Sequence, residues 1–290
     1  MSAQSLDQSA IGAAPGAAPG AAPAAVVTGP RRPSVALPGW TLPVLGVAAA
    51  VGLWWLLTDV LFASRPLVTG FSPTLTLTGL AELWRSGSLV DAAASSVFRL
   101  LAGLAVAFVV GVVGGIAVGS IGWLDRATRP VQLFLRMVSP LSWAPVAVIA
   151  FGVGGLPVVA LVAAAAVWPI LTATADGVRA VRPAHRQVAR SLGASRAEVV
   201  RHVVLPAIRP NVLAGLRLAM GLGWVVLVPA EMLGVTSGLG YAVLNAKDQL
   251  AYHHITALIL VIGTIGFALD VVARWAFASP RQRRDERAGR

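Results

Sequence analysis

Long apolar blocks separated by short polar stretches make up most of the chain. Each block is close to the roughly 20 residues that a helix needs to cross a bilayer. Backbone polar groups inside a bilayer must be paired within the protein, so blocks of this length predict helices rather than strands. The six predicted spans cover residues 41–62, 98–120, 131–152, 157–176, 211–234 and 255–277.

The first 36 residues have a different character. Gly12-Ala-Ala-Pro15 recurs twice more before residue 24. A low-complexity segment of this kind buries too little apolar surface to offset its ordering entropy, so we expect a disordered tail over 1–36. It lacks the basic start and unbroken apolar run of a signal peptide. A transmembrane domain over 37–279 follows, and a short basic tail over 280–290 ends the chain.

The composition is that of a membrane protein, and the positions of the arginines predict its orientation in the membrane. Hydrophobic residues make up 57% and charged residues 12%, and the mean hydropathy of +0.77 excludes an ordinary soluble domain. Without cysteine, disulfides and thiolate metal sites are excluded. With the N-terminus in the cytoplasm, all but four of the 23 basic residues lie on the cytoplasmic side. We therefore expect both termini, and the long loop 177–210, to be cytoplasmic.

The polar stretch from Gln187 to Pro206 predicts two short helices joined at Gly193. Glycine adopts the positive φ that often ends a helix. Ser195 and Glu198 form an S-x-x-E capping box, which starts a helix. Leu205-Pro206 is expected to stop that helix, because proline lacks an N–H group. A compact helix–glycine–helix unit exposed to water indicates a docking element.

The spacing of this stretch resembles the "EAA" loop of permease subunits in bacterial ATP-binding-cassette (ABC) importers. That signature has Glu-Ala-Ala, three residues, glycine, nine residues, an aliphatic residue, any residue, and Leu-Pro. Gln187 and Val188 replace the first Glu and Ala, and every interval is kept. The residues assigned by this resemblance to the ATPase-coupling loop are Gln187, Val188, Ala189, Gly193, Ser195, Glu198, Val203, Leu205 and Pro206.

Further motifs resemble the nitrate/sulfonate/taurine group of these permeases. They are residues 138–145, Trp168-Pro-Ile170, residues 230–233 and residues 237–241, and the similarity covers roughly 40–278. It implies an all-α type I importer permease with six transmembrane helices in the bacterial inner membrane. It also implies a permease homodimer, two ATPase subunits and an extracytoplasmic solute-binding protein that delivers a small anion.

Prolines and a glycine cluster at 152–155 in the third and fourth spans favour a helix bundle that lines a cavity. Proline at membrane depth frees carbonyl groups that neighbours or water must satisfy. Ordinary kinks without a pathway are the alternative. Glu231 in the fifth span is a candidate because a carboxylate there is costly, and it is expected to hold a gate or a neighbouring helix rather than an anion. The pathway or gate candidates are Pro140, Trp143, Pro145, Trp168 and Glu231.

Other notable residues have structural interpretations. Gly111, Gly115 and Gly119 have the small-residue spacing of close helix packing. Asp270 and Arg274 are four residues apart and are expected to pair on one helix face. His253 and His254 are adjacent in an outer loop and are expected to point apart, so we predict no metal site there.

No Walker A, H-E-x-x-H or nucleophile-elbow motif occurs in the sequence. We therefore expect a protein that is not an enzyme and holds no cofactor, with ATP and Mg²⁺ bound by a partner ATPase and no role for nucleic acid. The alternative function is a secondary transporter or channel that works without an ATPase. It would require internal inverted repeats or several intramembrane charges, and the sequence shows neither. For the arginines of the loop, binding to anionic lipid is the competing interpretation.

Overall fold

A computed structural model describes residues 41–277. The predicted tails at 1–36 and 280–290 lie outside these residues. The chain forms two units, residues 1–48 and 49–290. Of the first unit, only the start of the first helix is described, and the architecture below is that of the second.

Helices account for nearly all of residues 41–277, and no strand occurs among them, so the all-α prediction is confirmed. Five helices are long and apolar enough to cross a membrane, or up to six if a bent pair counts as one span. The helices are α1 (Thr41–Trp55, extended by a π-helical segment, Leu56–Leu61), α2 (Pro66–Thr69), α3 (Pro73–Arg85), α4 (Ser88–Ser120), α5 (Gly122–Met137), a 3-10 turn (Pro140–Trp143), α6 (Ala144–Phe151), α7 (Gly155–Ala180), α8 (Pro183–Ser191), α9 (Arg196–Val199, extended by a π-helical segment, Val200–Val204), α10 (Leu205–Gly234), α11 (Leu239–Asp248) and α12 (Tyr252–Phe277).

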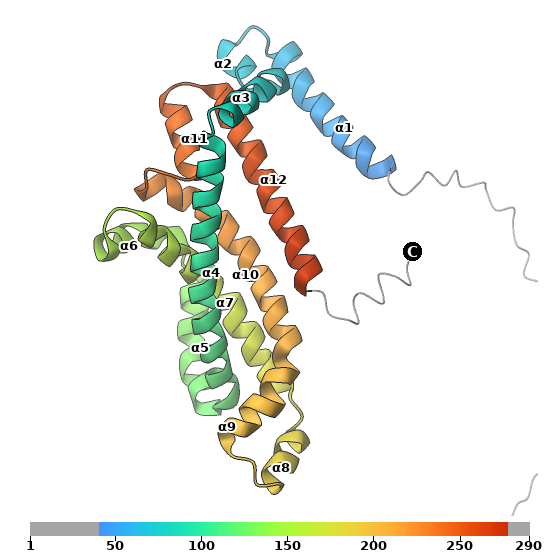
Figure 1. Cartoon of the computed structure of the whole chain (residues 1–290), viewed down its shortest axis with the longest axis vertical. Helices are drawn as coiled ribbons and strands as arrows, with labels where there is room; N and C mark the ends of the chain where they lie inside the picture. The colour runs from blue at the N-terminus through green and yellow to red at the C-terminus, as the bar shows by residue number, and fades with distance from the viewer. Residues whose placement is uncertain (1–40, 278–290) are drawn as a thin grey trace, which may run out of the picture. The chain divides into compact units, whose positions relative to one another are not determined.

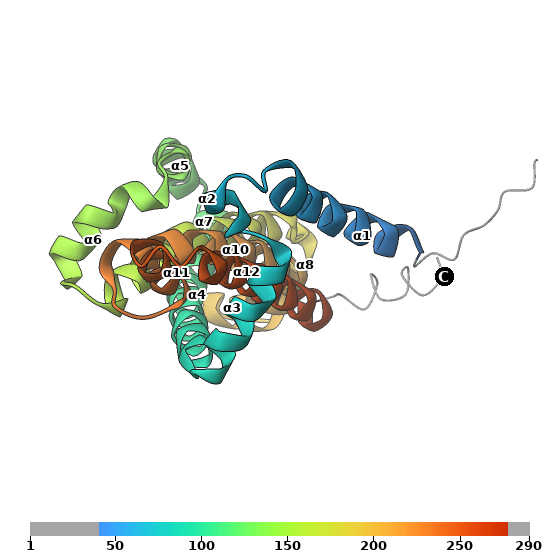
Figure 2. The same cartoon turned by 90° about the horizontal axis from the view of Figure 1, so that it is seen from above.

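Helices α4, α7 and α10 run side by side and enclose the core (Figure 1, Figure 2). Leu100, Ile170 and Leu227, one from each helix, are fully buried there. A Cβ atom at Gly115 would lie 2.6 Å from Thr174 Cβ, and one at Gly111 would lie 2.9 Å from Ile170 Cβ. The glycines of α4 therefore let α7 approach at backbone distance, as their spacing predicts.

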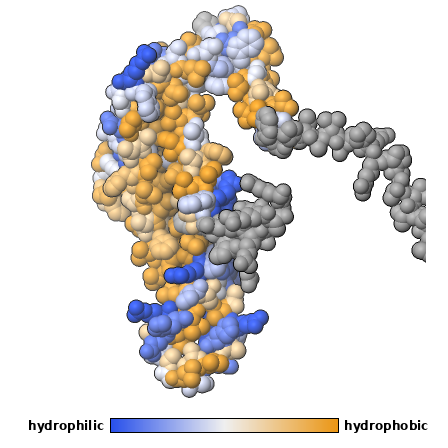
Figure 3. Space-filling model, turned by 45° about the vertical axis from the view of Figure 1, so that its right-hand side comes forward, coloured by the Kyte–Doolittle hydropathy of each residue, from blue (hydrophilic) through white to orange (hydrophobic). Residues whose placement is uncertain are grey.

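The two ends of this bundle carry different elements. Helices α8 and α9 lie at one end, and α3 and α11 lie at the other (Figure 1). Between the ends, large apolar side chains such as Phe98, Val113 and Phe267 are exposed, and Figure 3 shows hydrophobic residues over the middle with hydrophilic ones near the α8–α9 end. An exposed apolar band of this extent suits contact with lipid.

The span predicted over 131–152 is not one helix. Helix α5 ends at Met137, and the segment from Pro140 to Phe151 is bent from it by 91°. Ser139, which precedes Pro140, has ψ 129°. Proline disfavours helical ψ in the residue before it, so the chain leaves the helix at this position.

The predicted stop at Leu205-Pro206 is wrong. One helical run continues from Arg196 to Gly234. The π-helical turn before α10 pairs the Leu205 N–H with Val200 O, and Pro206 then falls in the first turn of α10. The π-helical turn directly before Pro206 shifts the hydrogen-bond register, so the helical run continues past the N–H that proline lacks.

Candidate functional site

Helix α8 ends in a tight turn at Gly193. Its φ is +81°, the Gly193 N–H donates to Arg190 O (2.9 Å), and the Ala194 N–H donates to Ala189 O (3.0 Å). This pair of hydrogen bonds is the Schellman motif, which satisfies the last carbonyl groups of a helix. The positive φ predicted for Gly193 is confirmed, and its role in the coupling loop stays a prediction.

Helix α9 begins at once with the predicted capping box. The Glu198 N–H donates to Ser195 Oγ (3.3 Å), and the Ser195 N–H donates to Glu198 Oε2 (2.8 Å). Both contacts satisfy donors that a helix start leaves unpaired. Only three residues, 192–194, therefore separate the last residue of α8 from Ser195, the N-cap of α9.

A small apolar cluster fixes this α8–α9 segment, residues 183–199, to the bundle. Val178 at the end of α7, Val199 in α9 and Ile208 in α10 are buried together. An Arg186 Nη2–H also donates to Val178 O, so α8 is tied to a carbonyl near the end of α7. The segment is thus held in a defined position.

The free face of the segment exposes apolar side chains. Leu192 is 82% exposed and Val188 is 61% exposed. Exposed apolar residues on a fixed, capped element are typical of a docking surface. Of the predicted coupling residues, Ala189 and Val203 are half-buried and the others are exposed: Gln187, Val188, Gly193, Ser195, Glu198, Leu205 and Pro206.

A cavity of about 740 Å³ lies between α5, α7, α10 and the 3-10 turn. Three predicted pathway residues, Pro140, Trp143 and Trp168, line it, whereas Pro145 and Glu231 do not. Arg136 supplies the only charge among the lining side chains. The α7 residues of the lining, 164–169, lie halfway along that helix, so the cavity lies at mid-bundle depth, and Arg136 at its edge is exposed. In the sequence, Arg136 entered only the count of cytoplasmic basic residues, although its position close to Pro140 marked it as a possible pathway residue.

Glu231 lies apart from this cavity in a buried polar cluster. It is fully buried, accepts hydrogen bonds from Ser96 Oγ (2.8 Å) and the Gly240 N–H (3.0 Å), and forms an ion pair with Arg99 Nη1 (2.6 Å). Arg99 also donates to Ser237 O at 2.8 Å. The cluster joins α4, α10 and the turn before α11, which agrees with a role in holding neighbouring helices.

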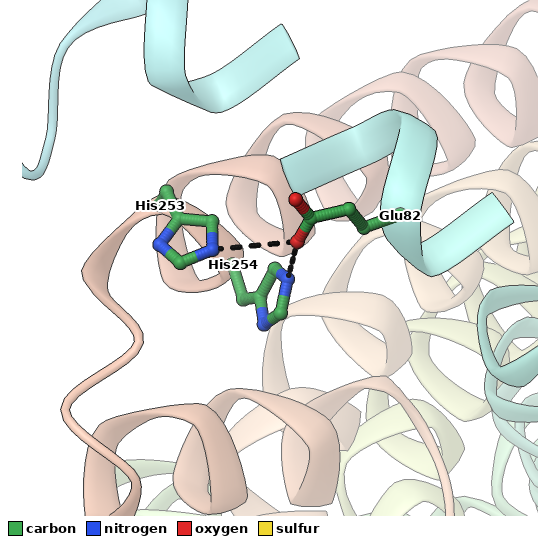
Figure 4. Close-up of side chains that lie close together, drawn as sticks. All are labelled: Glu82, His253 and His254. Atoms are coloured by element: carbon green, nitrogen blue, oxygen red, sulfur yellow. Dashed lines mark hydrogen bonds and ion pairs between the residues drawn. The ribbon is translucent and has the colours of Figure 1, made fainter. Parts of the chain in front are cut away.

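His253 and His254 lie in the first turn of α12 rather than in a loop. Their Nε2 atoms are 3.5 and 2.9 Å from Glu82 Oε2 (Figure 4). The prediction that they point apart is wrong, because side chains about 100° apart around a helix can both reach a group on the neighbouring helix. The hydrogen bond with His254 is the main cause that holds the pKa of Glu82 below 4.5.

Comparison with known proteins identifies the family. Residues 107–283 match the model of the binding-protein-dependent transport system inner membrane component. The chain belongs to this family. It is 33% identical to the taurine transport system permease protein TauC of Escherichia coli, over 81% of this chain and 86% of that protein.

Similarity extends to two permeases of Synechococcus elongatus. The chain is 36% identical to the bicarbonate transport system permease protein CmpB and 32% identical to the nitrate import permease protein NrtB. Each alignment covers 62% of this chain and 66% of the relative, just under two thirds of its length. The family and the apolar helices make the protein a multi-pass inner-membrane permease, not an enzyme in its own right. A secondary transporter or channel is not favoured.

The fold has a solved counterpart. A chain of the MetNI methionine ABC transporter, in an inward-facing conformation, superposes with a TM-score of 0.51 over 66% of this chain and 96% of that chain. Sequence identity is 16%, so the likeness concerns the fold. That fold agrees with the predicted importer-permease class.

Proposed function

We propose that this chain provides the transmembrane pathway of an ATP-driven importer for a small anion. The relatives named above act on bicarbonate, nitrate and taurine, which are small molecules with an anionic group. The cavity at mid-bundle depth supports this class, because its single charge is the Arg136 guanidinium and its other lining side chains are uncharged. A guanidinium offers several N–H donors to a carboxylate, nitrate or sulfonate.

The α8–α9 segment is proposed to dock in a groove of a separate ATPase subunit. The observation that supports this most directly is its combination of a fixed attachment to the bundle with an exposed apolar face at Val188 and Leu192. Motion of the ATPase would then reach α7 and α10 through the buried valines. The partner ATPase would bind ATP and Mg²⁺, and a solute-binding protein on the other side of the membrane would deliver the anion.

The proposed assembly contains two copies of this chain, two ATPase subunits and one solute-binding protein, with both chain termini in the cytoplasm. The permease alone is expected to show no ATPase activity. One copy of the cavity would form half of a shared pathway.

The decisive experiment compares two substitutions at Gly193. A Cβ atom there meets nothing within 4 Å, so a substitution changes only the backbone preference. Valine disfavours the φ of +81°, at a cost of about 1–2 kcal/mol, whereas asparagine tolerates left-handed backbone. We expect Gly193→Val to lower co-purification of the co-expressed ATPase and transport by about one order of magnitude, and Gly193→Asn to retain most of both.

Membrane insertion is the control, and both variants should reach the membrane in equal amounts. Retention of the ATPase by a well-inserted Gly193→Val protein would overturn the docking role. Lipid binding is tested separately by Arg→Lys substitutions at the exposed residues Arg190, Arg196 and Arg201. These preserve charge, so an element that works only by attracting anionic lipid would tolerate them and would also tolerate Gly193→Val.

A further inference from the structure

Three side chains with metal-binding chemistry converge between α3 and α12. Glu82 comes from the last turn of α3, and His253 and His254 come from the first turn of α12 (Figure 4). Their ligand atoms all lie within 4.8 Å of one another. We propose that Glu82, His253 and His254 bind a divalent transition-metal ion of the zinc class.

The ligand set and its spacing suit zinc. Two imidazole nitrogens and one carboxylate oxygen form a three-ligand zinc site whose fourth position stays open to water. With metal–ligand bonds of about 2.0–2.2 Å, ligand atoms of a tetrahedral site lie about 3.3 Å apart. The Nε2–Oε2 distances of 2.9 and 3.5 Å bracket this value. Small adjustments of the three side chains would therefore accommodate the ion.

The two helices hold the ligands on a fixed frame. Thr76 Oγ1 donates to Thr256 Oγ1 at 2.8 Å, which links α3 to α12 near the ligands. At Gly79, a Cβ atom would lie 2.8 Å from His253 O, so the two backbones approach closely one turn before Glu82. Ligands on packed helices are positioned more precisely than ligands on loops.

A plain hydrogen-bonded ion pair accounts for this cluster less well. The side chain of Glu82 is 58% exposed, and pairs at such a site contribute little to stability. The two imidazole rings also lie with centroids only 4.2 Å apart while both Nε2 atoms approach one oxygen. Both Nε2 atoms thus converge on one carboxylate oxygen, as they would around a shared metal ion. Among the residues that the structure describes, no other three such groups come together.

The test titrates zinc into the full-length protein, purified in detergent with an affinity tag that contains no histidine. Competition with a chromophoric zinc indicator should show one ion per chain at micromolar zinc. Loss of outer-sphere partners alone weakens zinc sites about 10–100-fold, so we expect His253→Ala, His254→Ala and Glu82→Ala each to weaken binding at least about tenfold. Zinc should also raise the unfolding temperature of the wild type but not of these variants.

The chain supplies matched controls. It has four histidines and no cysteine, and His185 and His202 lie outside the cluster. The His185→Ala and His202→Ala variants should bind zinc as the wild type does. Glu82→Gln keeps a hydrogen-bond acceptor, so it should leave the metal-free unfolding temperature unchanged while zinc binding falls.

Three results would overturn the site. They are no saturable binding below millimolar zinc, unchanged binding in the Glu82 and His254 variants, and an equal loss in the His185 and His202 controls. Each readout concerns metal binding alone, so the outcome is independent of whether the α8–α9 segment docks an ATPase.

Discussion

At the scale of single residues, the buried carboxylate of Glu231 shows how a charge is accommodated inside the helix bundle. Removing an ion pair from water costs several kcal/mol per ion unless geometry and further hydrogen bonds compensate. Here Arg99, Ser96 and the Gly240 N–H satisfy the carboxylate. A Cβ atom at Gly238 would collide with it, so the turn before α11 closes tightly over the pair.

We predict that Glu231→Gln lowers the free energy of unfolding by about 3–5 kcal/mol, because it leaves the Arg99 cation buried without its counter-ion. Thermal unfolding of the purified protein in detergent measures the loss. Asp270→Asn is the matched control. Asp270 is 43% exposed and pairs with Arg274, as its spacing predicts, and with Arg217 of α10 at 3.7 Å. Loss of an exposed pair costs about 0–1 kcal/mol. Equal effects of the two substitutions would contradict this account.

Glu231 could be singled out from the sequence, but its partners could not. A carboxylate within an apolar block is easily recognised in the sequence, because burial of a charge in the membrane is costly. Ser96 and Arg99, however, lie 135 and 132 residues away along the chain, and only tertiary packing brings them to Glu231. Arg136 is close to Pro140 along the chain, but its cavity neighbours in α7 and α10 are brought to it only by tertiary packing.

At the scale of elements, local chemistry was predictable and helix continuity was not. The Schellman turn and the capping box involve residues within six positions of one another, so their sequence pattern specifies them. The stop expected at Pro206 failed because a π-helical turn removed the conflict with its missing N–H. The break at Pro140 was hidden within a block whose overall hydropathy looked like one span.

The capping box gives a prediction about docking strength. Ser195→Ala removes the acceptor for the Glu198 N–H and should destabilise α9 by about 1 kcal/mol. We expect faster hydrogen exchange of the α9 amides and about fivefold weaker binding of the ATPase if α9 must be formed in the complex. Ser191→Ala, at the exposed last residue of α8, is the matched control. If exchange in α9 rises while ATPase binding is unchanged, α9 is not part of the docking surface.

At the scale of the whole molecule, two independent features predict the membrane topology. They are the arrangement of the helices and the distribution of the arginines. Within residues 49–277, the α4–α5 connection at Ile121 lies at the same end as α8 and α9, and the end of α11 at Asp248 lies at the other (Figure 1). The ion pair between Asp125 and Arg179, at 2.5 Å, fixes the start of α5 beside the end of α7. The arginine count alone decides which end faces the cytoplasm.

One set of reporter fusions tests both predictions, the arrangement of the helices and their orientation in the membrane. Reporters placed after Ile121 and after Arg190 should both report the cytoplasm, and one after Asp248 should report the outside. A cytoplasmic fluorescent protein and an externally active phosphatase at each position measure both outcomes. If all three positions report one side, the helices between them do not cross the membrane as the fold requires. If the sides are exchanged, the fold stands but the orientation is reversed, and the α8–α9 segment then faces away from any cytoplasmic ATPase. That second result would remove the docking role even though every contact in the segment remained as described.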